Sequence, residues 1–256
     1  MTPPRYSIVV PAYNEAERLG SSLERMLAYI EDSKWPAEVI VVNDGSSDQT
    51  AAVVKEFARH NPIVRLIDNP GNRGKGFSVR NGMLNASGQF LLFTDADLSS
   101  PIEEAPKLLA AIENGGADVA IGSRYLRSEL QTRKQPLHRR MLGRAFNLAL
   151  RLILGLAYVD TQCGFKAFSR TAVNTIFPDV KIERWGFDPE ILFLAKRYGL
   201  RVVEVPVSWA HDHRSKINPI RDGARMFGEL MRVRMNSFSG KYNPSTSATR
   251  VMTKIA

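Results

Sequence analysis

The sequence predicts an α/β fold with a mostly parallel central sheet, and two observations support this prediction. Short runs rich in Val, Ile and Leu recur through the first half of the 256-residue chain. Between these runs, apolar residues repeat at the spacing of amphipathic helices. Alternating strands and helices require a parallel sheet with helices on its faces, and right-handed crossovers then fix most of the topology.

The expected strands of the first half span residues 6–10, 38–42, 63–67, 89–93 and 118–122. Helical spacing of apolar residues follows the first strand at 19–30 and the second at 51–57. After the fourth strand, Pro101 suits the first turn of another helix, because proline tolerates that position. These elements form regular β/α units.

The second half of the chain does not continue this regular alternation of strands and helices. A basic amphipathic stretch covers 138–158, helical patterns cover 184–199 and 220–238, and a last strand at 201–207 returns to the sheet. Residues 239–256 have the composition of a disordered tail. We therefore expect a single domain over 1–238, in which 1–125 and 126–238 form two parts with different tasks.

The composition limits the classes of protein to which the chain can belong. With 44% hydrophobic residues the chain can bury a large core, and its single cysteine, Cys163, excludes an internal disulfide framework and favours a reducing compartment. We expect no signal peptide and no membrane-spanning helix. The net charge of +9 predicts an anionic partner, such as a phosphorylated ligand or an acidic membrane surface. We expect no nucleic acid, because the basic residues form no known recognition motif.

Polar loops follow four of the predicted strands, at 11–15, 43–48, 94–101 and 123–125. Ligands of parallel sheets bind at the carboxyl ends of the strands, so these loops are expected to converge on one edge. In the second loop, Asp44 stands at the strand tip, where its carboxylate can accept a hydrogen bond from a base or ribose. Asp48 is equally explained as a helix cap.

The fourth strand ends in two carboxylates, Asp95 and Asp97, spaced to project to the same side of an extended segment. Together they can hold a divalent cation bound to a diphosphate, and Mg²⁺ or Mn²⁺ suits such oxygen ligands. Aspartates at strand ends also make turns and helix caps. Taken alone, the pair does not decide between these interpretations.

A glycine-rich loop at 69–82 carries Arg73 and Lys75 before a predicted helix, which suits a phosphate or a nucleotide. Since Gly76 follows Lys75, the loop is not a P-loop. His211 and His213 are better explained as surface residues or phosphate partners than as zinc ligands. Cys163 is expected to be a packing residue, because no base stands beside it.

In order and spacing, VVPAYNE (9–15), VVNDGSSDQT (41–50), NRGKGFSVRNG (72–82), TDADL (94–98) and GSRY (122–125) resemble family 2 glycosyltransferases with the GT-A fold. Within that family, DTQCGFKAF (160–168) and RWGFDPEIL (184–192) look most like dolichyl-phosphate β-glucosyltransferases. The resemblance covers about residues 5–236. Polyprenyl-phosphate mannosyltransferases are the nearest alternative.

The resemblance implies inverting transfer of a sugar, with glucose from UDP-glucose expected, to the phosphate of a polyprenyl carrier of the dolichyl type. Residues 1–125 would bind the nucleotide sugar, and 126–238 would form the acceptor and membrane-facing part. Another donor, GDP-mannose or UDP-GlcNAc, and a soluble saccharide acceptor are the alternatives. The sequence does not separate these sugars, because they differ by contacts that it does not specify.

The resemblance also implies roles for individual residues of the donor site. Pro11, Tyr13, Glu15 and Asp44 would line the nucleoside pocket, together with Lys75 of the glycine-rich loop on the donor side. Asp95 and Asp97 would face the diphosphate through Mg²⁺ or Mn²⁺, with Ala96 touching the nucleotide by its backbone. Ser99 would be a weak or water-mediated third ligand.

Four further residues would act on phosphate or on the acceptor. Arg124 matches a phosphate-binding position, and Arg214 and Lys216 resemble a basic loop that closes over the donor. Asp188 corresponds to a position near the reacting centre, where it would orient the acceptor or, for a hydroxyl acceptor, act as a base.

Relatives carry an N-terminal anchor or C-terminal spans, and we find neither pattern here. We therefore expect peripheral association with the cytoplasmic face of a membrane. The stretch 136–159 contains Arg139, Arg140, Arg144 and Arg151 among leucines, as an interfacial helix would. A core helix with solvated arginines is the alternative interpretation.

Overall fold

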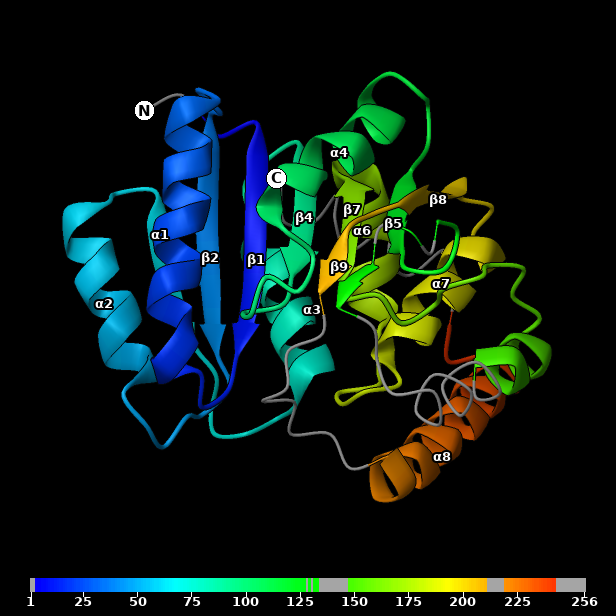
Figure 1. Ribbon diagram of the computed structural model, residues 1–256. Coiled ribbons are helices and arrows are strands. Elements are labelled where there is room, and N and C mark those ends of the chain that lie inside the picture. The colour runs from blue at the N-terminus through cyan, green and yellow to red at the C-terminus, as the bar shows by residue number, and fades with distance from the viewer. Residues whose placement is uncertain (1–2, 128, 130, 134–146, 211–218, 243–256) are drawn as a thin grey trace, which may run out of the picture.

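The computed structural model describes residues 3–127, 129, 131–133, 147–210 and 219–242 (Figure 1). A seven-stranded sheet in the order β3-β2-β1-β4-β7-β5-β8 forms its centre. The strands are β1 (Tyr6–Ala12), β2 (Ala37–Asn43), β3 (Val64–Asp68), β4 (Phe90–Thr94), β5 (Val119–Ser123), β7 (Phe165–Ser169) and β8 (Val202–Pro206). A separate two-stranded sheet pairs β6 (Gln131–Arg133) with β9 (Trp209–Ala210). The six predicted strands are confirmed.

The strand β7 is not among the predicted strands, and it runs antiparallel to both of its neighbours, β4 and β5. Its sequence, FKAFS, has a lysine where a central strand normally has an apolar residue. Lys166 is nevertheless fully buried. A charged residue in the middle of a central strand therefore concealed the strand from a pattern-based prediction.

The helices are α1 (Ala16–Asp32), α2 (Thr50–His60), α3 (Lys75–Asn85), α4 (Ala105–Glu113), α6 (Arg170–Ile176), α7 (Phe187–Arg197) and α8 (Pro219–Phe238). Two short 3-10 helices, η1 (Ile102–Glu104) and η3 (Phe177–Asp179), precede α4 and follow α6. Residues 147–154 are also helical. The predicted helices are thus present, although the one expected at Pro101 begins as η1.

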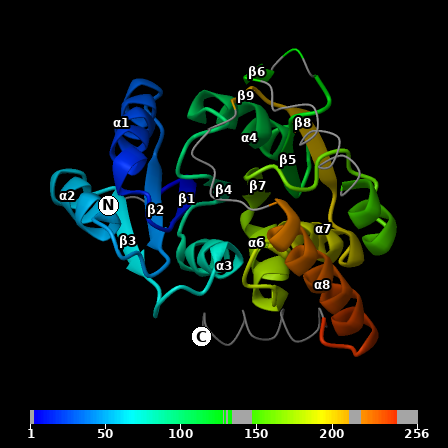
Figure 2. The same cartoon turned by 60° about the horizontal axis from the view of Figure 1, so that its bottom comes forward.

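The helices cover the sheet in two layers (Figure 2). Because successive side chains of a strand point to opposite faces, Ile8 and Val10 pack with α1, α2 and α4, while Val9 packs with α3, α6 and α7. Leu230 and Val233 bring α8 into the second layer. Both faces of the sheet are therefore buried.

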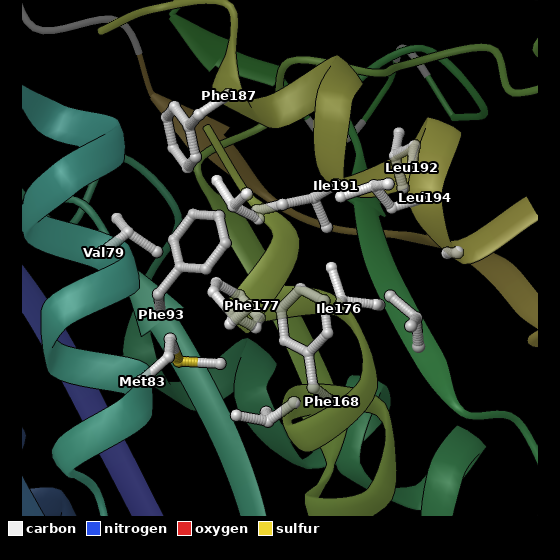
Figure 3. Packing of buried hydrophobic residues seen from close by; sticks show 14 of the residues in the cluster. Val79, Met83, Phe93, Phe168, Ile176, Phe177, Phe187, Ile191, Leu192 and Leu194 are labelled. Carbon is white, nitrogen blue, oxygen red and sulfur yellow. The ribbon is translucent and has the colours of Figure 1, made fainter. Parts of the chain in front are cut away.

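Aromatic side chains fix α7 against the second face of the sheet (Figure 3). The ring of Phe93 on β4 lies 6.1 Å from that of Phe168 on β7 and 5.9 Å from that of Phe187 on α7. All three are fully buried. Full burial of a phenylalanine contributes about 1.5–3 kcal/mol. This packing holds the start of α7 directly behind the end of β4.

The chain after α8 remains packed as far as residue 242. Tyr242 is buried, its ring lies 6.2 Å from that of Phe193, and its hydroxyl donates a hydrogen bond to Glu190 (2.5 Å). Tyr242 of the expected tail is therefore packed against the core, and residues 243–256 lie outside the described residues. No helix in the described part of the chain combines the length and the apolar character that crossing a membrane requires.

The strand order places a topological switch between β1 and β4. From β1 the chain proceeds outward to β2 and β3, and then returns to β4 on the other side of β1. Crevices that bind ligands form outside the carboxyl ends of strands at such a switch. The polar loops predicted at 11–15 and 94–101 follow these two strands.

Candidate functional site

A cavity of about 500 Å³ opens at the carboxyl ends of β1, β2 and β4. Its walls include eight residues that the sequence indicates: Pro11, Tyr13, Glu15, Asp44, Lys75, Asp95, Ala96 and Asp97. The other lining residues are Ala12, Arg18, Asn72, Gly74, Ser78, Arg184, Trp185 and Arg225. Three of the four expected loops therefore converge on this cavity, and the fourth, at 123–125, contributes no lining residue.

Asp44 organises the floor of the cavity. Its Oδ1 accepts hydrogen bonds from Asn69 Nδ2 (2.9 Å) and from the backbone N–H of Arg73 (3.0 Å), and its Oδ2 accepts from the N–H of Gly74 (2.7 Å). A carboxylate offers about four acceptor positions. Three protein donors therefore leave Asp44 room for about one more donor, from a ligand.

The glycine-rich loop depends on two close backbone approaches. Gly45 has φ +67°, and a Cβ there would lie 2.5 Å from the backbone of Gly71. A Cβ on Gly74, which has φ +111°, would lie 2.5 Å from the backbone oxygen of Glu183. Only glycine fits both the positive φ and the space.

Asp95 and Asp97 lie in a turn rather than on an extended segment. The N–H of Leu98 donates to the backbone oxygen of Asp95 (3.1 Å), and Leu98 itself has φ +48°. The N–H of Ser99 donates to Asp97 Oδ1 (2.9 Å). The predicted extended geometry is thus wrong, because β4 ends at Thr94, but the turn still directs both carboxylates into the cavity. Ser99 supports Asp97 and does not line the cavity.

Cations balance the two carboxylates. Lys75 Nζ lies 2.5 Å from Asp95 Oδ1, and Arg18 Nη1 lies 3.5 Å from Asp97 Oδ2. Arg18 also forms an ion pair with Glu15. Burial and the charge of Asp95 raise the pKa of Asp97. Arg18 therefore offsets only part of the cost of keeping Asp97 charged in this position.

Lys75 occupies a strongly charged position at the start of α3. Burial alone would lower the pKa of Lys75, but the carboxylates of Asp95 and Asp188 outweigh burial and raise it. The ammonium also lies 5.7 Å from the centre of the Trp185 ring. Lys75 therefore stays protonated at the wall of the cavity.

Asp188 lies behind this wall and does not line the cavity. It is almost fully buried on α7, and its Oδ1 forms an ion pair with Lys166 Nζ. The same ammonium donates to the backbone oxygen of Cys163 (2.5 Å). Burial raises the pKa of Asp188, and Lys166 and Lys75 oppose this effect. The predicted catalytic role of Asp188 stays a prediction.

Gly164 supports Asp95 from the back. A Cβ at this position would overlap the Asp95 carboxylate. The backbone before β7 therefore touches a predicted metal ligand. Gly164 belongs to the segment 160–168, but no sequence pattern indicates this contact.

Arg124 also lies away from the cavity. Its Nε and Nη2 donate to Asp160 at 2.7 and 2.8 Å, and its own N–H donates to Asp160 Oδ2 (3.0 Å). Burial would lower the pKa of Arg124, but Asp160 raises it well above its usual value. The proposed contact of Arg124 with phosphate stays a prediction.

Eight lining residues were not among the predicted site residues, and three of these come from the second half of the chain. Arg184 and Trp185 reach the cavity from the loop before α7, and Arg225 reaches it from α8. Glu190 holds this loop by accepting hydrogen bonds from the N–H groups of Lys181 and Ile182. Glu229 of α8 accepts from the N–H of Gly186 (2.7 Å). Segments from the second half of the chain thus contribute to the wall of the cavity.

Several predicted residues lie outside the described residues. They are Arg214 and Lys216 of the predicted basic loop, His211 and His213, and Arg139, Arg140 and Arg144 of the predicted interfacial stretch. Of that stretch, Arg151 is described, and Arg151 Nη2 donates to the backbone oxygen of Ala157 (3.3 Å).

Asp95 and Asp97 fit a divalent cation by their chemistry. Within the described ranges, no group of three or more His, Cys, Asp and Glu side chains is arranged to hold a metal ion. Two adjacent carboxylates in one turn nevertheless match a metal that takes its other ligands from a bound diphosphate. The raised pKa of Asp97 agrees, since a cation would relieve the repulsion between the two carboxylates.

Comparisons with known proteins identify relatives over most of the chain. The sequence profile of Glycosyl transferase family 2 matches residues 7–177. The chain is 34% identical to the dolichyl-phosphate beta-glucosyltransferase of Dictyostelium discoideum, over 91% of this chain and 75% of the relative. It is 38% identical to dolichyl-phosphate beta-glucosyltransferase ALG5C of Trichomonas vaginalis, over 79% of this chain but only 63% of that longer relative.

Among solved structures, glucosyl-3-phosphoglycerate synthase of Mycobacterium tuberculosis has the same fold. Its complex with Mn²⁺, UDP-glucose and phosphoglyceric acid superposes with a TM-score of 0.66 at 18% identity, covering 90% of this chain and 79% of the synthase. Its complex with Mg²⁺ and UDP gives a TM-score of 0.65 at 18% identity, covering 91% and 79%. The predicted GT-A architecture is confirmed.

Proposed function

Because the chain belongs to glycosyl transferase family 2, we propose that it transfers glucose from UDP-glucose to the phosphate of a polyprenyl carrier of the dolichyl type. The relatives named dolichyl-phosphate beta-glucosyltransferases support this acceptor and this sugar. UDP-glucose bound by a synthase of the same fold supports the donor.

The observation that carries the proposal is the charge pattern of the cavity. Asp95 and Asp97 line the cavity beside the cations Lys75 and Arg18, and Arg184 and Arg225 add two further cations to its lining. A nucleoside diphosphate sugar carries a diphosphate that needs a metal on one side and cations on the other. A neutral or purely cationic ligand would leave the arginines and the lysine of the cavity without an anionic partner.

The nucleoside would lie over the ends of β1 and β2. Pro11 and Tyr13 supply apolar and aromatic surface there, and Tyr13 is 44% exposed, which leaves its ring free to stack. The remaining acceptor position of Asp44 would receive an N–H of the base or a ribose hydroxyl. Ala96 would contact the nucleotide through its backbone.

Asp95 and Asp97 would hold Mg²⁺ or Mn²⁺, which when bound would neutralise the charge that grows on the departing UDP. Lys75 and Arg18 would then share their positive charge with the diphosphate as well as with the two aspartates. Since these side chains already stand in the wall, little reorganisation would accompany the transfer. Ser99 would act through its hydrogen bond to Asp97.

The acceptor phosphate would approach from the side of Arg184 and Arg225. A phosphate monoester is ionised near neutral pH, so its oxygen can attack the anomeric carbon without a strong base. The new bond joins that oxygen to the sugar carbon, and the bond between this carbon and the UDP oxygen breaks with inversion. UDP leaves with the electron pair.

Asp188 would act through Lys75 in this reaction. Its carboxylate is sealed from the cavity by burial and is paired with Lys166, but its charge raises the pKa of Lys75. We therefore assign it the role of keeping Lys75 charged and in place. Arg124 would similarly order the loop after β5 through Asp160.

The transfer would take place at a membrane surface, because a polyprenyl phosphate resides in a bilayer. The cytoplasmic face is favoured by Cys163, which is buried and unpaired, as expected in a reducing compartment.

The deciding experiment incubates the protein with Mg²⁺, polyprenyl phosphate and one of several nucleotide sugars, and identifies the lipid product by mass. We expect a hexosyl polyprenyl phosphate from UDP-glucose, and its loss on chelation of the metal. Product from GDP-mannose or UDP-GlcNAc alone would overturn the assigned donor. Transfer to a soluble saccharide, with none to the lipid, would overturn the assigned acceptor.

A further inference from the structure

Two neighbouring helices expose an apolar surface that the proposed transfer does not use. It consists of Leu148 and Leu152 from residues 147–154 and of Phe227, Met231, Met235 and Phe238 from α8, and we call it the apolar strip. Leu152, Met235 and Phe238 are 74%, 67% and 85% exposed. Side chains of this size and exposure in one region indicate an interaction site.

The strip is a regular feature of both helices. On α8, Phe227, Met231 and Met235 follow one another at four-residue spacing and therefore share one face. Leu230 and Val233, on the other face, are fully buried in the core. Leu150 and Leu154 are buried in the same core, while Leu148 and Leu152 are exposed. Each helix thus has one apolar face that packs in the core and a second apolar face that is exposed.

The two helices are joined directly. Arg234 Nε of α8 donates to the backbone oxygen of Ile153 (2.6 Å), and Figure 2 shows the end of α8 beside this short helix. Arg197 Nη1 donates to Ser237 Oγ (3.1 Å), and Lys196 Nζ donates to the backbone oxygen of Gly155 (2.5 Å). The last turn of α7 therefore adds two cations to the same region.

Most charged residues around the apolar strip are cations. Over 225–238 the sequence contains Arg225, Arg232 and Arg234, and Glu229 is its only acid. The Glu229 carboxylate is engaged with the N–H of Gly186. Residues 147–154 contain Arg151 and no acid. The segments that carry the apolar strip thus contain more cations than acids, and Glu229 offsets only part of this positive charge.

From this pattern we infer that the apolar strip docks onto a bilayer surface that contains anionic lipid, with Met235, Phe238 and Leu152 entering the headgroup region. Apolar side chains flanked by Arg and Lys are the combination that binds such surfaces. A second copy of the chain would instead bring its own arginines against these arginines. The repulsion would oppose that pairing, whereas anionic headgroups neutralise it.

Docking in this orientation has a consequence for the cavity, which rests on the proposed function. Arg225 lines the cavity on the same helix that carries Phe238, about 20 Å away at the rise of an α-helix. A phosphate carried at headgroup depth would therefore reach Arg225 and Arg184 without leaving the bilayer surface. The same helix would serve both the membrane and the acceptor phosphate.

The inference is tested by co-sedimentation of the full chain with vesicles, without any nucleotide sugar. Vesicles of phosphatidylcholine mixed with phosphatidylglycerol are compared with phosphatidylcholine alone. We expect binding to the mixed vesicles that weakens with added salt. Met235→Glu and Phe238→Glu should each lower this binding roughly tenfold or more, since each removes an apolar anchor and adds an anionic charge.

Leu84→Glu is the matched control. Leu84 is an exposed leucine on α3, outside the apolar strip, and its replacement changes the net charge equally. Wild-type protein that ignores anionic vesicles, or a Met235→Glu variant that binds them as well as Leu84→Glu does, would overturn the inference. So would a concentration-dependent dimer in solution that Met235→Glu abolishes, because the strip would then belong to a second copy.

Vesicle binding and sugar transfer can fail separately. Binding without any transfer to lipid would overturn the proposed function and leave the docking surface intact. UDP-glucose affinity, measured by calorimetry, should be the same for Met235→Glu and wild type, which shows that the variant is folded and that its cavity is unaffected.

Discussion

Two Lys–Asp ion pairs lie near the end of β4, one at the wall of the cavity and one in the core. They have the same chemistry but differ in their exposure to solvent. Lys75 and Asp95 face the cavity, with side chains that are 18% and 35% exposed. Lys166 and Asp188 are sealed in the core, with side chains that are 0% and 6% exposed. Each pair nevertheless influences the other, since Asp188 raises the pKa of Lys75.

The difference shows how one type of contact serves two purposes. The pair at the cavity can exchange its partner for a ligand, because water and solutes reach it. The sealed pair cannot, and removing one member would leave an uncompensated charge in the core. The following predictions separate the two pairs, in order of decreasing effect.

The largest effect should come from the cavity side. Asp97→Ala removes one of the two proposed metal ligands, so sugar transfer should fall by about a thousandfold or more, or roughly 4 kcal/mol of transition-state stabilisation. The melting temperature should change little, because the substitution also removes the buried charge of Asp97 and its repulsion with Asp95. Undiminished transfer by this variant would sink the metal assignment.

Removing one member of the sealed pair, Lys166 and Asp188, should instead lower the stability of the protein. Lys166→Met leaves Asp188 buried beside an apolar side chain, and we expect about 3–4 kcal/mol less stability in urea unfolding. The double variant Lys166→Met with Asp188→Leu should recover most of that loss, since it removes both charges. A single variant as stable as the wild type would contradict a structural role for this pair.

A substitution at Gly164 tests the contact between the backbone before β7 and Asp95 at the cavity. Gly164→Ala places a methyl group against the Asp95 carboxylate, so transfer should fall by about a hundredfold, or roughly 3 kcal/mol. Gly199→Ala is a control for glycine replacement, because a Cβ there meets no atom within 4 Å, although φ at Gly199 is +72°. Equal transfer by the two variants would show that Asp95 tolerates displacement.

Glu190, two residues after Asp188 on α7, provides the smallest effect. Burial raises the pKa of Glu190 to about 7 from the usual 4.5. The folded protein thus binds a proton that the unfolded chain has lost, so stability should fall as pH rises, by about 2 kcal/mol between pH 5 and pH 7. Urea unfolding at several pH values measures this dependence.

Glu190→Gln should remove that part of the pH dependence. The variant keeps a side chain of the same shape beside the Tyr242 hydroxyl, and it cannot titrate. Parallel curves of stability against pH for the variant and the wild type would show that another group carries the dependence.

Much of the cavity could be predicted from the sequence because its residues stand in short local motifs at the ends of strands. Asp44, Lys75, Asp95 and Asp97 follow runs whose strand character is evident from the sequence alone. A parallel sheet necessarily brings such ends together. Eight of the residues named in advance therefore line one cavity.

The residues that escaped prediction depend on contacts between distant segments. Arg225 reaches the cavity only because α8 packs through Leu230 and Val233 against the second face of the sheet. Trp185 is placed by Glu190 and Glu229, which hold the loop before α7. No local sequence pattern predicts the position of Arg225 or that of Trp185.

The sequence by itself determined the β/α units, the loops at the ends of their strands, and the carboxylates and cations within those loops, since these follow from local periodicity. Only the tertiary structure decided that β7 enters the sheet in the reverse direction and carries Lys166 into the core. It also decided that Asp188 meets Lys166 behind the wall while Asp95 meets Lys75 at its surface. The physical reason is that burial, which separates these two roles, depends on packing between segments far apart in the chain.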